Sequence, residues 1–183
     1  MKHSVEPSPY LFPLPAVLVS CGNNEKSNLI TISWTGTLSS DPPMCYISVR
    51  PERHSRSLLQ DHPFFVINLL ETKYLKAVDG CGIVSGRNHN KWEHFHLTPE
   101  KSLKVTVPSV QEALLNIECE IASINPMGSH DVMMARVLAV RADERLLDEK
   151  GRPDLSSAGW IVYNKGFYHS LGPIIGKYGQ AGK

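Results

Sequence analysis

Residues 28–55 read NLITISWTGTLSSDPPMCYISVRPERHS, and this stretch predicts the fold more directly than any other part of the chain. Its first seven residues alternate between two faces, as a half-buried β-strand requires. The two faces carry Leu29, Thr31, Ser33 and Thr35 on one side, and Ile30, Ile32 and Trp34 on the other. A polar loop with Ser, Asp and Pro turn chemistry follows, and a second strand is predicted at residues 44–50. The small hydroxyls of the first strand are therefore available to a ligand or a partner.

A short helix is predicted at residues 55–61, with Ser55 as its N-cap. Arg50 ends the strand before this helix, and Arg53 and His54 are close in sequence. Free backbone N–H groups and the helix dipole both favour an anion at a helix start. The stretch therefore predicts a phosphate site around Arg50 and Ser55.

The remaining patterns indicate a mainly β protein with a few short helices. Further strands are expected at residues 16–20, 64–70, 113–124, 131–140 and, as the last one, 160–163. A helix is expected at residues 71–79, a loop at 81–92, an irregular or edge segment at 101–107, and an arm that a partner could exchange at 172–179. Short strands joined by hairpins predict an antiparallel β-barrel that forms a single domain over residues 1–183.

The strand at residues 113–124 shows the clearest alternation in the chain. Its inward face is predicted to carry Leu115, Ile117, Cys119 and Ile121, and its outward face Asn116, Glu118 and Glu120. A turn containing Gly128-Ser-His-Asp131 joins it to the next strand, and Asp131 is expected to cap that turn. Considered alone, His130 reads as a surface residue or a partner of the local backbone.

Composition limits the classes of function. The 183 residues are 42% hydrophobic and 20% charged, with a net charge of +1, so neither nucleic acid nor a membrane is an expected partner. No apolar run approaches the roughly 20 residues of a membrane span, and the N-terminal residues do not resemble a signal peptide. The four cysteines are widely spaced without a C-x-x-C pair, which favours a reduced, cytoplasmic protein.

Side-chain chemistry of the usual catalytic kinds is not indicated. His89, His94 and His96 cluster, but no cysteine pair or carboxylate group joins them, so solvated histidines are favoured over a metal site. Cys45 and Cys81 lack a histidine-plus-acid grouping, so buried structural thiols are favoured over a nucleophile. The sequence predicts no metal site and no catalytic side chain.

Three short motifs resemble the flavin reductase-like family of FMN-binding split barrels, and within it the flavoredoxin-type proteins. They are Thr31-Ile-Ser-Trp-Thr-Gly36, Ser40-Asp-Pro-Pro43 and Ile47-Ser-Val-Arg-Pro51, and the resemblance extends from about Pro13 to about Gly172. It implies an FMN-binding split β-barrel that forms a homodimer, in which the bound flavin carries the chemistry.

The resemblance also implies where FMN would bind. Ser85, Gly86 and Lys91 lie in a basic loop that, considered alone, is a mobile surface loop; in the family such a loop closes over the flavin. Lys91 becomes a candidate for the N1 edge of the flavin, and His130 and Trp34 for its surroundings. The full set of expected FMN contacts is Asn28, Thr31, Ser33, Trp34, Thr35, Ser48, Val49, Arg50, Ser55, Ser85, Gly86, Lys91, His130 and Tyr163.

Three functions remain open at this point. One is NAD(P)H-dependent flavin reduction, with NADH or NADPH as a second ligand. Another is a flavoredoxin-like electron carrier that exchanges electrons with redox protein partners. The third is a binding module without flavin. The absence of a nicotinamide-binding motif does not separate the first two, because flavin reductases of this family lack one as well.

Overall fold

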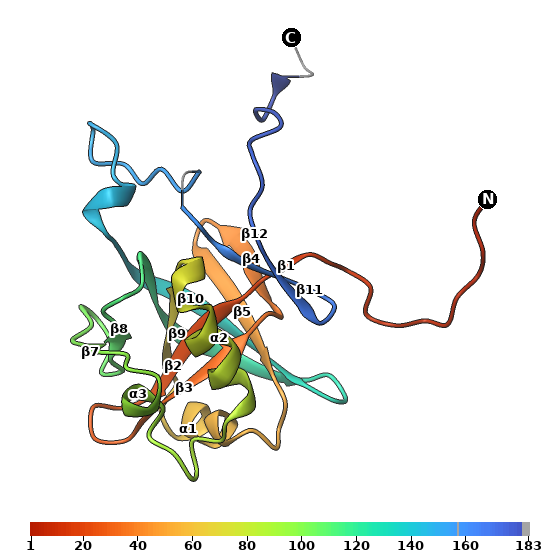
Figure 1. Ribbon diagram of the computed structural model, residues 1–183. Helices are drawn as coiled ribbons and strands as arrows, with labels where there is room; N and C mark the ends of the chain where they lie inside the picture. The colour runs from red at the N-terminus through yellow and green to blue at the C-terminus, as the bar shows by residue number, and fades with distance from the viewer. Residues whose placement is uncertain (157, 181–183) are drawn as a thin grey trace.

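The computed structural model describes residues 1–156 and 158–180 and has a β-barrel at its centre (Figure 1). The main sheet has the strand order β3-β2-β6-β9-β10-β5-β4, and every neighbouring pair is antiparallel. Its strands are β2 (Val17–Gly22), β3 (Ser27–Ile32), β4 (Thr35–Ser40), β5 (Pro43–Val49), β6 (Phe64–Leu69), β9 (Leu115–Pro126) and β10 (Asp131–Ala142). The predicted mainly β, antiparallel fold is confirmed.

The chain itself joins the two edges of this sheet. The edge strands β3 and β4 follow one another, with only Ser33 and Trp34 between them. The backbone N–H of Ser48 on β5 donates to the carbonyl of Trp34 at 2.9 Å, which brings the end of β3 against β5. The sheet therefore curls into a barrel, and the connection at Trp34 lies at its closure.

Short elements cover the outside of the barrel. The helices are α1 (His54–Asp61), α2 (Leu75–Ile83) and α3 (Lys91–His94), with 3-10 turns η1 (Thr72–Tyr74) and η2 (Glu144–Leu146). The small sheets contain β1 (Leu14–Pro15), β11 (Ile161–Asn164) and β12 (Phe167–Ser170) in one, and β7 (Pro99–Glu100) and β8 (Ser109–Val110) in the other. Both ends of the described chain extend away from the barrel (Figure 1). Among the described residues, no helix combines the length and the apolar character needed to cross a membrane.

Strand β3 is buried on both faces, which corrects the prediction of a half-buried strand. Ile30 and Ile32 face the interior of the barrel, while Leu29 belongs to a second apolar cluster beneath α2 and α3. The hydroxyl of Thr31 donates to the carbonyl of Val78 on α2. The face expected to offer hydroxyls to a ligand is thus partly covered by α2.

Three other boundaries differ from the predictions. The segment predicted as a polar loop is β4, an edge strand whose pairing with β5 shifts register between Thr37 and Ser39. The predicted loop at residues 81–92 begins as helix, because α2 continues to Ile83 and packs Cys81 against the barrel. The strand at 160–163 is followed by a further one, β12. In each case tertiary packing outweighs local composition.

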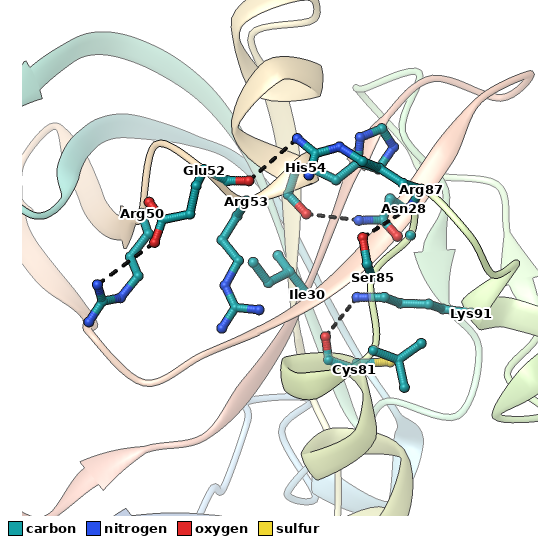
Figure 2. Close-up of a pocket in the computed structure, with 13 residues that line it drawn as sticks. Asn28, Ile30, Arg50, Glu52, Arg53, His54, Cys81, Ser85, Arg87 and Lys91 are labelled. Carbon is teal, nitrogen blue, oxygen red and sulfur yellow. Dashed lines mark hydrogen bonds and ion pairs between the residues drawn. The ribbon is translucent and has the colours of Figure 1, made fainter.

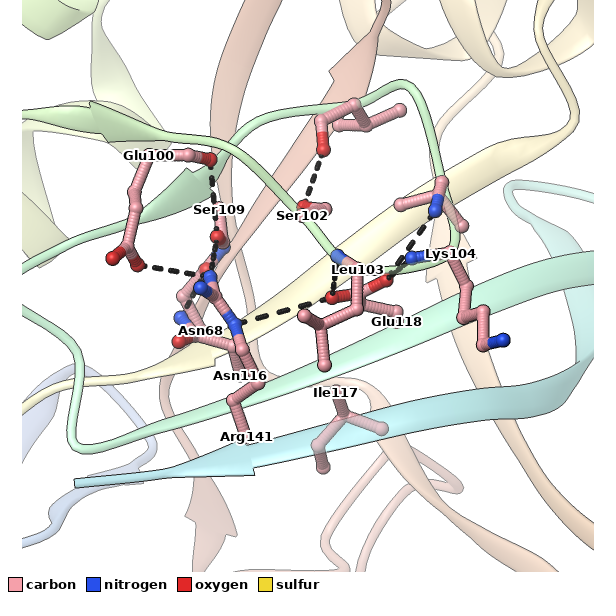
Figure 3. A network of polar contacts seen from close by, with 12 residues as sticks. Asn68, Glu100, Ser102, Leu103, Lys104, Ser109, Asn116, Ile117, Glu118 and Arg141 are labelled. Atoms are coloured by element: carbon pink, nitrogen blue, oxygen red, sulfur yellow. Dashed lines mark hydrogen bonds and ion pairs between the residues drawn. The ribbon is translucent and has the colours of Figure 1, made fainter. Parts of the chain in front are cut away.

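Asn116 and Glu118 lie on the face of β9 opposite to Ile117 and Cys119, as predicted, but other segments of the chain cover this face, so that both side chains are buried rather than exposed to solvent. The side chain of Glu118 is fully buried, and its carboxylate accepts hydrogen bonds from the backbone N–H groups of Leu103 (2.7 Å), Lys104 (2.6 Å) and Val105 (3.3 Å) (Figure 3). Residues 101–107 therefore wrap around this carboxylate, and a charged residue organises the segment predicted to be irregular.

Candidate functional site

Two adjoining hollows lie between α1, the C-terminal end of α2 and the ends of β3 and β5. The larger, here called the cationic hollow, has a volume of about 380 Å³ and is lined by Asn28, Arg50, Arg53, Ser55, Arg87 and Lys91 among others. The smaller, here called the tryptophan hollow, has a volume of about 180 Å³ and includes Trp34, Ser48 and His130. Ile30, Arg50 and Arg53 line both, so the two hollows form one continuous site.

Positive charge dominates the cationic hollow. Arg50 lies 3.8 Å from Glu52, and Arg87 reaches the backbone carbonyl of Glu52 at 3.4 Å. The guanidinium of Arg53 points into the hollow (Figure 2), and no carboxylate among the described residues pairs with it. Burial, and then the charge of Arg87, lower the pKa of His54, as a region of positive potential would.

The first turn of α1 faces the positively charged side chains of the cationic hollow. The first N–H groups of a helix have no partner within the helix, and Arg53, the N-cap of α1, provides no side-chain cap. Ser55, predicted to be the N-cap, instead lies inside the first turn. Its buried hydroxyl accepts a hydrogen bond from the side-chain amide of Asn28 at 2.8 Å. The turn is therefore left open towards the hollow.

A glycine shapes the opposite wall. Gly86 packs so closely on Asn28 that a Cβ atom at this position would overlap the Asn28 amide. Any side chain here would displace the amide that bonds to Ser55. Asn28, Ser55 and Gly86 are thus brought together from three separate elements, as are Arg50 and Ser85, which line the same hollow.

Lys91 is held in a different way from the prediction. Lys91 is not part of a mobile loop. It is the first residue of α3, and its side chain is buried. Its ammonium donates to the backbone carbonyls of Leu29 and Cys81, both at 2.7 Å. Burial lowers the pKa of Lys91. Because an ammonium has three N–H donors, one remains beyond these two bonds while the residue lines the hollow.

The tryptophan hollow contains an aromatic pair. The rings of Trp34 and His130 lie 4.3 Å apart at 35°, and the other predicted contacts lining this hollow are Thr31, Ser33, Ser48, Val49 and Arg50. Burial, and then the charge of Arg50, lower the pKa of His130. The ring therefore favours its neutral form, in which one nitrogen donates and the other accepts.

A largely buried ion pair joins α1 to the hairpin turn beside the site. Arg56 in α1 donates through Nε to Asp131 at 2.6 Å, and the two side chains are 17% and 8% exposed. Asp131 follows His130 directly and pairs in register with Val49 on β5. One carboxylate thus connects the first turn of α1, the end of β5 and the hairpin turn. The predicted capping role of Asp131 is replaced by this ion pair.

Two predicted contacts lie outside both hollows. The hydroxyl of Thr35 donates to the carbonyl of Tyr46 at 2.6 Å, so it stabilises the β4–β5 pair. Tyr163 on β11 packs against Phe12 and Tyr168, with ring centroids 5.9 Å and 5.7 Å away. Arg53 was not among the expected contacts, although it lines both hollows. The sequence does contain an indication that Arg53 lines the site, because Arg53 lies two residues before Ser55 at the start of a helix.

No metal centre is found in the described residues, and Cys81, the thiol that lines the cationic hollow, is not activated as a nucleophile. No group of three potential metal ligands occurs among the described residues, and the rings of His89 and His94 lie 5.6 Å apart on the surface side of α3. Cys81 lines the cationic hollow, but burial raises the pKa of its thiol to about 11. It is therefore a protonated thiol near neutral pH and a poor nucleophile.

The family model of the flavin reductase like domain matches residues 10–172. This chain belongs to the flavin reductase-like family. The resemblance inferred from residues 28–55 is thereby confirmed. An uncharacterized protein of Archaeoglobus fulgidus is 33% identical over 147 residues, which cover 80% of this chain and 81% of that relative.

Solved structures of similar proteins extend the comparison to the fold of the whole chain. The flavoredoxin of Desulfovibrio vulgaris (Miyazaki F) matches with a TM-score of 0.90 and 25% identity, over 100% of both chains. An FMN-binding protein from Thermus thermophilus matches with a TM-score of 0.78 and 29% identity, over 93% of both chains. The barrel is therefore the split barrel of this flavin-related family.

Proposed function

We propose that this chain binds FMN across the two joined hollows and mediates flavin-dependent electron transfer. The phosphate would bind in the cationic hollow and the flavin ring in the tryptophan hollow. The observation that carries this proposal is Arg53, whose guanidinium has no carboxylate partner among the described residues and lines both hollows beside the open first turn of α1. A phosphate monoester supplies the anion that this arrangement lacks.

The donor set fits such a ligand. Arg50, Arg53 and Arg87 provide planar guanidinium groups that can bind phosphate oxygens in pairs, and the first N–H groups of α1 add backbone donors. The close packing of Gly86 on Asn28 keeps this wall free of a side chain. The combined volume of the hollows falls within the range of about 300–1,000 Å³ typical of small-molecule sites.

Bound FMN would supply hydride or electron acceptance, and the chain would supply binding, orientation and electrostatics. Arg50, which lines both hollows, would favour an anionic ring through its positive charge, and Trp34 with His130 would pack against the apolar surface of the ring. Lys91 would add positive charge at the cationic end. No side chain of this site is needed as a general acid or base, in agreement with the lack of a carboxylate pair in its lining.

Two reactions are compatible with this site. One is flavin reduction, the reaction after which the family is named, with NADH or NADPH as the proposed donor. A carrier that exchanges electrons with redox proteins is supported by the likeness to the Desulfovibrio flavoredoxin over the whole of both chains. A homodimer is part of the same proposal, because the C-terminal arm exposes Ile174 (74%), Ile175 (98%) and Tyr178 (105%), side chains that a second copy could bury.

The visible absorption spectrum of the purified protein, followed by anaerobic additions of NADH and NADPH, tests the proposal. A flavin spectrum that one nucleotide bleaches identifies a reductase and its donor. A flavin spectrum that only dithionite bleaches identifies the carrier. A colourless protein whose properties do not change when FMN is added would contradict flavin binding.

A further inference from the structure

Glu52 is an acidic side chain in a lining that is otherwise cationic or neutral. Among the described residues that line the two hollows, no other aspartate or glutamate occurs. The side chain of Glu52 is 67% exposed, so it does not lie there to fill the core. A carboxylate beside a site for a phosphate is unfavourable, because like charges repel at short range. The proposed FMN site therefore contains a charge that opposes its own ligand.

Glu52 contacts two of the three arginines of the cationic hollow. Its carboxylate lies 3.8 Å from the guanidinium of Arg50, and its backbone carbonyl accepts a hydrogen bond from Arg87 at 3.4 Å (Figure 2). Arg53, in contrast, has no carboxylate partner in the described part of the chain. An incoming phosphate can therefore bind Arg53 directly, but it has to compete with Glu52 for Arg50.

The ion pair between Arg50 and Glu52 is weak enough for a ligand to open it. Its 3.8 Å separation is longer than a hydrogen bond, and the two side chains are 52% and 67% exposed, so the pair contributes little to stability. A phosphate monoester carries nearly two negative charges and can bind a guanidinium through two oxygens, so it can replace the carboxylate. The displaced carboxylate still lines the hollow, and its repulsion of the phosphate remains in the complex.

The charge of Glu52 also acts on the tryptophan hollow. Burial and then the charge of Arg50 lower the pKa of His130, whereas the charge of Glu52 raises it. Arg50 lines both hollows, so a carboxylate beside Arg50 weakens the positive potential at both ends of the site.

We propose that Glu52 is a specificity-determining residue that limits how strongly the site prefers FMN over riboflavin, and so keeps FMN exchangeable. Before FMN binds, the carboxylate pairs with Arg50, and in the complex it opposes the phosphate. Riboflavin has no phosphate and is not subject to this competition. The inference rests on the proposed function, and it favours a chain that reduces FMN and releases it over one that retains FMN as a fixed carrier.

Titration of flavin-free Glu52→Gln with FMN and with riboflavin, followed by flavin fluorescence, tests the proposal. The amide keeps the size of the side chain and removes its charge, and the backbone carbonyl that binds Arg87 is unchanged. FMN should bind about 5- to 20-fold more tightly than to the wild type and dissociate more slowly by a similar factor, while riboflavin affinity should change by less than about twofold. Glu52→Asp, which keeps the charge, should bind FMN within about threefold of the wild type.

Glu120→Gln is the matched control. Glu120 lies 3.9 Å from Arg136 in another exposed ion pair, outside both hollows, so its loss of charge should leave FMN affinity unchanged. The proposal would be overturned by an FMN affinity that Glu52→Gln leaves unchanged or lowers. An equal gain for riboflavin, or the same gain in Glu120→Gln, would also overturn it.

An NMR titration of the His130 ring in the flavin-free protein separates this inference from the proposed function. The pKa of His130 should be lower in Glu52→Gln than in the wild type, because the charge that raises it is lost. An unchanged pKa would overturn the inference even where FMN binds. A lowered pKa in a protein that binds no FMN in either form would contradict the proposed function, and with it this inference.

Discussion

Glu118 and Arg53 are both charged residues held against the barrel, but the protein neutralises only one of them. Three backbone N–H groups bind the carboxylate of Glu118, and Arg141 lies 4.0 Å away with further contacts to Glu100 and Ser109 (Figure 3). The guanidinium of Arg53, by contrast, faces the cationic hollow without a paired carboxylate in the described chain (Figure 2).

The difference separates structural charges from ligand-binding charges. A buried charge must be satisfied by the fold, because an unpaired one costs several kcal/mol. A charge at the wall of an open hollow can remain hydrated until a ligand replaces the water. Charge satisfaction, rather than the presence of a charged residue, therefore distinguishes the two regions, and substitutions in each should affect different quantities.

Loss of the Glu118 carboxylate should give the largest effect on stability. Glu118→Ala leaves three backbone N–H groups without their acceptor and removes a fully buried carboxylate around which residues 101–107 fold, so we expect the free energy of unfolding to fall by about 3–5 kcal/mol. Urea denaturation measures it. Glu120→Ala is the matched control: Glu120 is 40% exposed and lies 3.9 Å from Arg136, so its loss should cost less than about 1 kcal/mol. Equal losses for the two variants would contradict the role of Glu118.

Loss of the Asp131 carboxylate should reduce both the stability of the fold and the affinity for FMN. Asp131→Asn keeps the shape of the side chain but leaves the largely buried Arg56 unpaired, so we expect a loss of about 2–3 kcal/mol in unfolding free energy. Since this pair also positions α1 against His130, FMN affinity should fall as well. A variant that loses stability but binds FMN as the wild type does would show that the pair does not position the site.

Loss of the Arg53 guanidinium should change ligand binding without changing stability. Arg53→Ala removes charge-assisted contacts to phosphate, so FMN should bind about 10- to 100-fold more weakly while riboflavin affinity stays the same. The free energy of unfolding should change by less than about 0.5 kcal/mol. Arg136→Ala, at a 59% exposed arginine on β10, is the control and should change neither affinity. A similar loss for both ligands would remove Arg53 from the phosphate site.

The smallest effect is expected from the titration of His130. Its pKa is lowered in the folded protein, so the unfolded chain binds more protons in the window between that lowered value and about 6.5. Stability should therefore fall as the pH drops through this window. His130→Gln lacks this contribution, so its stability relative to the wild type should improve from about pH 7.5 to about pH 5.5. Urea midpoints at both pH values measure the change, and a constant difference would contradict it.

The sequence predicted the parts of the fold that depend on local patterns. Alternation at residues 113–124 located β9, the strand predicted at residues 44–50 after a turn is β5, and turn residues located the hairpin bend before Asp131. Local sequence patterns did not predict the strand β4 or the burial of Glu118. The Ser- and Thr-rich β4 is a strand only because β5 pairs with it, and Glu118 is buried only because a distant segment, residues 101–107, folds over it. Neither partner is visible in local periodicity.

In the candidate site, too, local sequence predicted some features, while others depend on segments that are distant in the chain. Arg50 and Ser55, around which a phosphate site was predicted, line the same hollow, because the strand end and the helix start are adjacent in sequence. Asn28 and Gly86 joined it through the family resemblance, and the structure brings them together. Thr35 and Tyr163 were also expected from the family resemblance, but they lie outside the hollows. Thr35 donates to a backbone carbonyl, and Tyr163 packs against Phe12. Their neighbours depend on the closure of the barrel, which local sequence patterns do not specify.

Calorimetric titration of the flavin-free protein with FMN and, separately, with riboflavin tests the central claim most directly. The two ligands share the flavin ring and differ in the phosphate, so their affinity ratio measures what the open charges of the cationic hollow contribute. We predict that FMN binds at least about 100-fold more tightly than riboflavin, which corresponds to about 2.7 kcal/mol. Equal affinities would contradict the assignment of the cationic hollow to a phosphate.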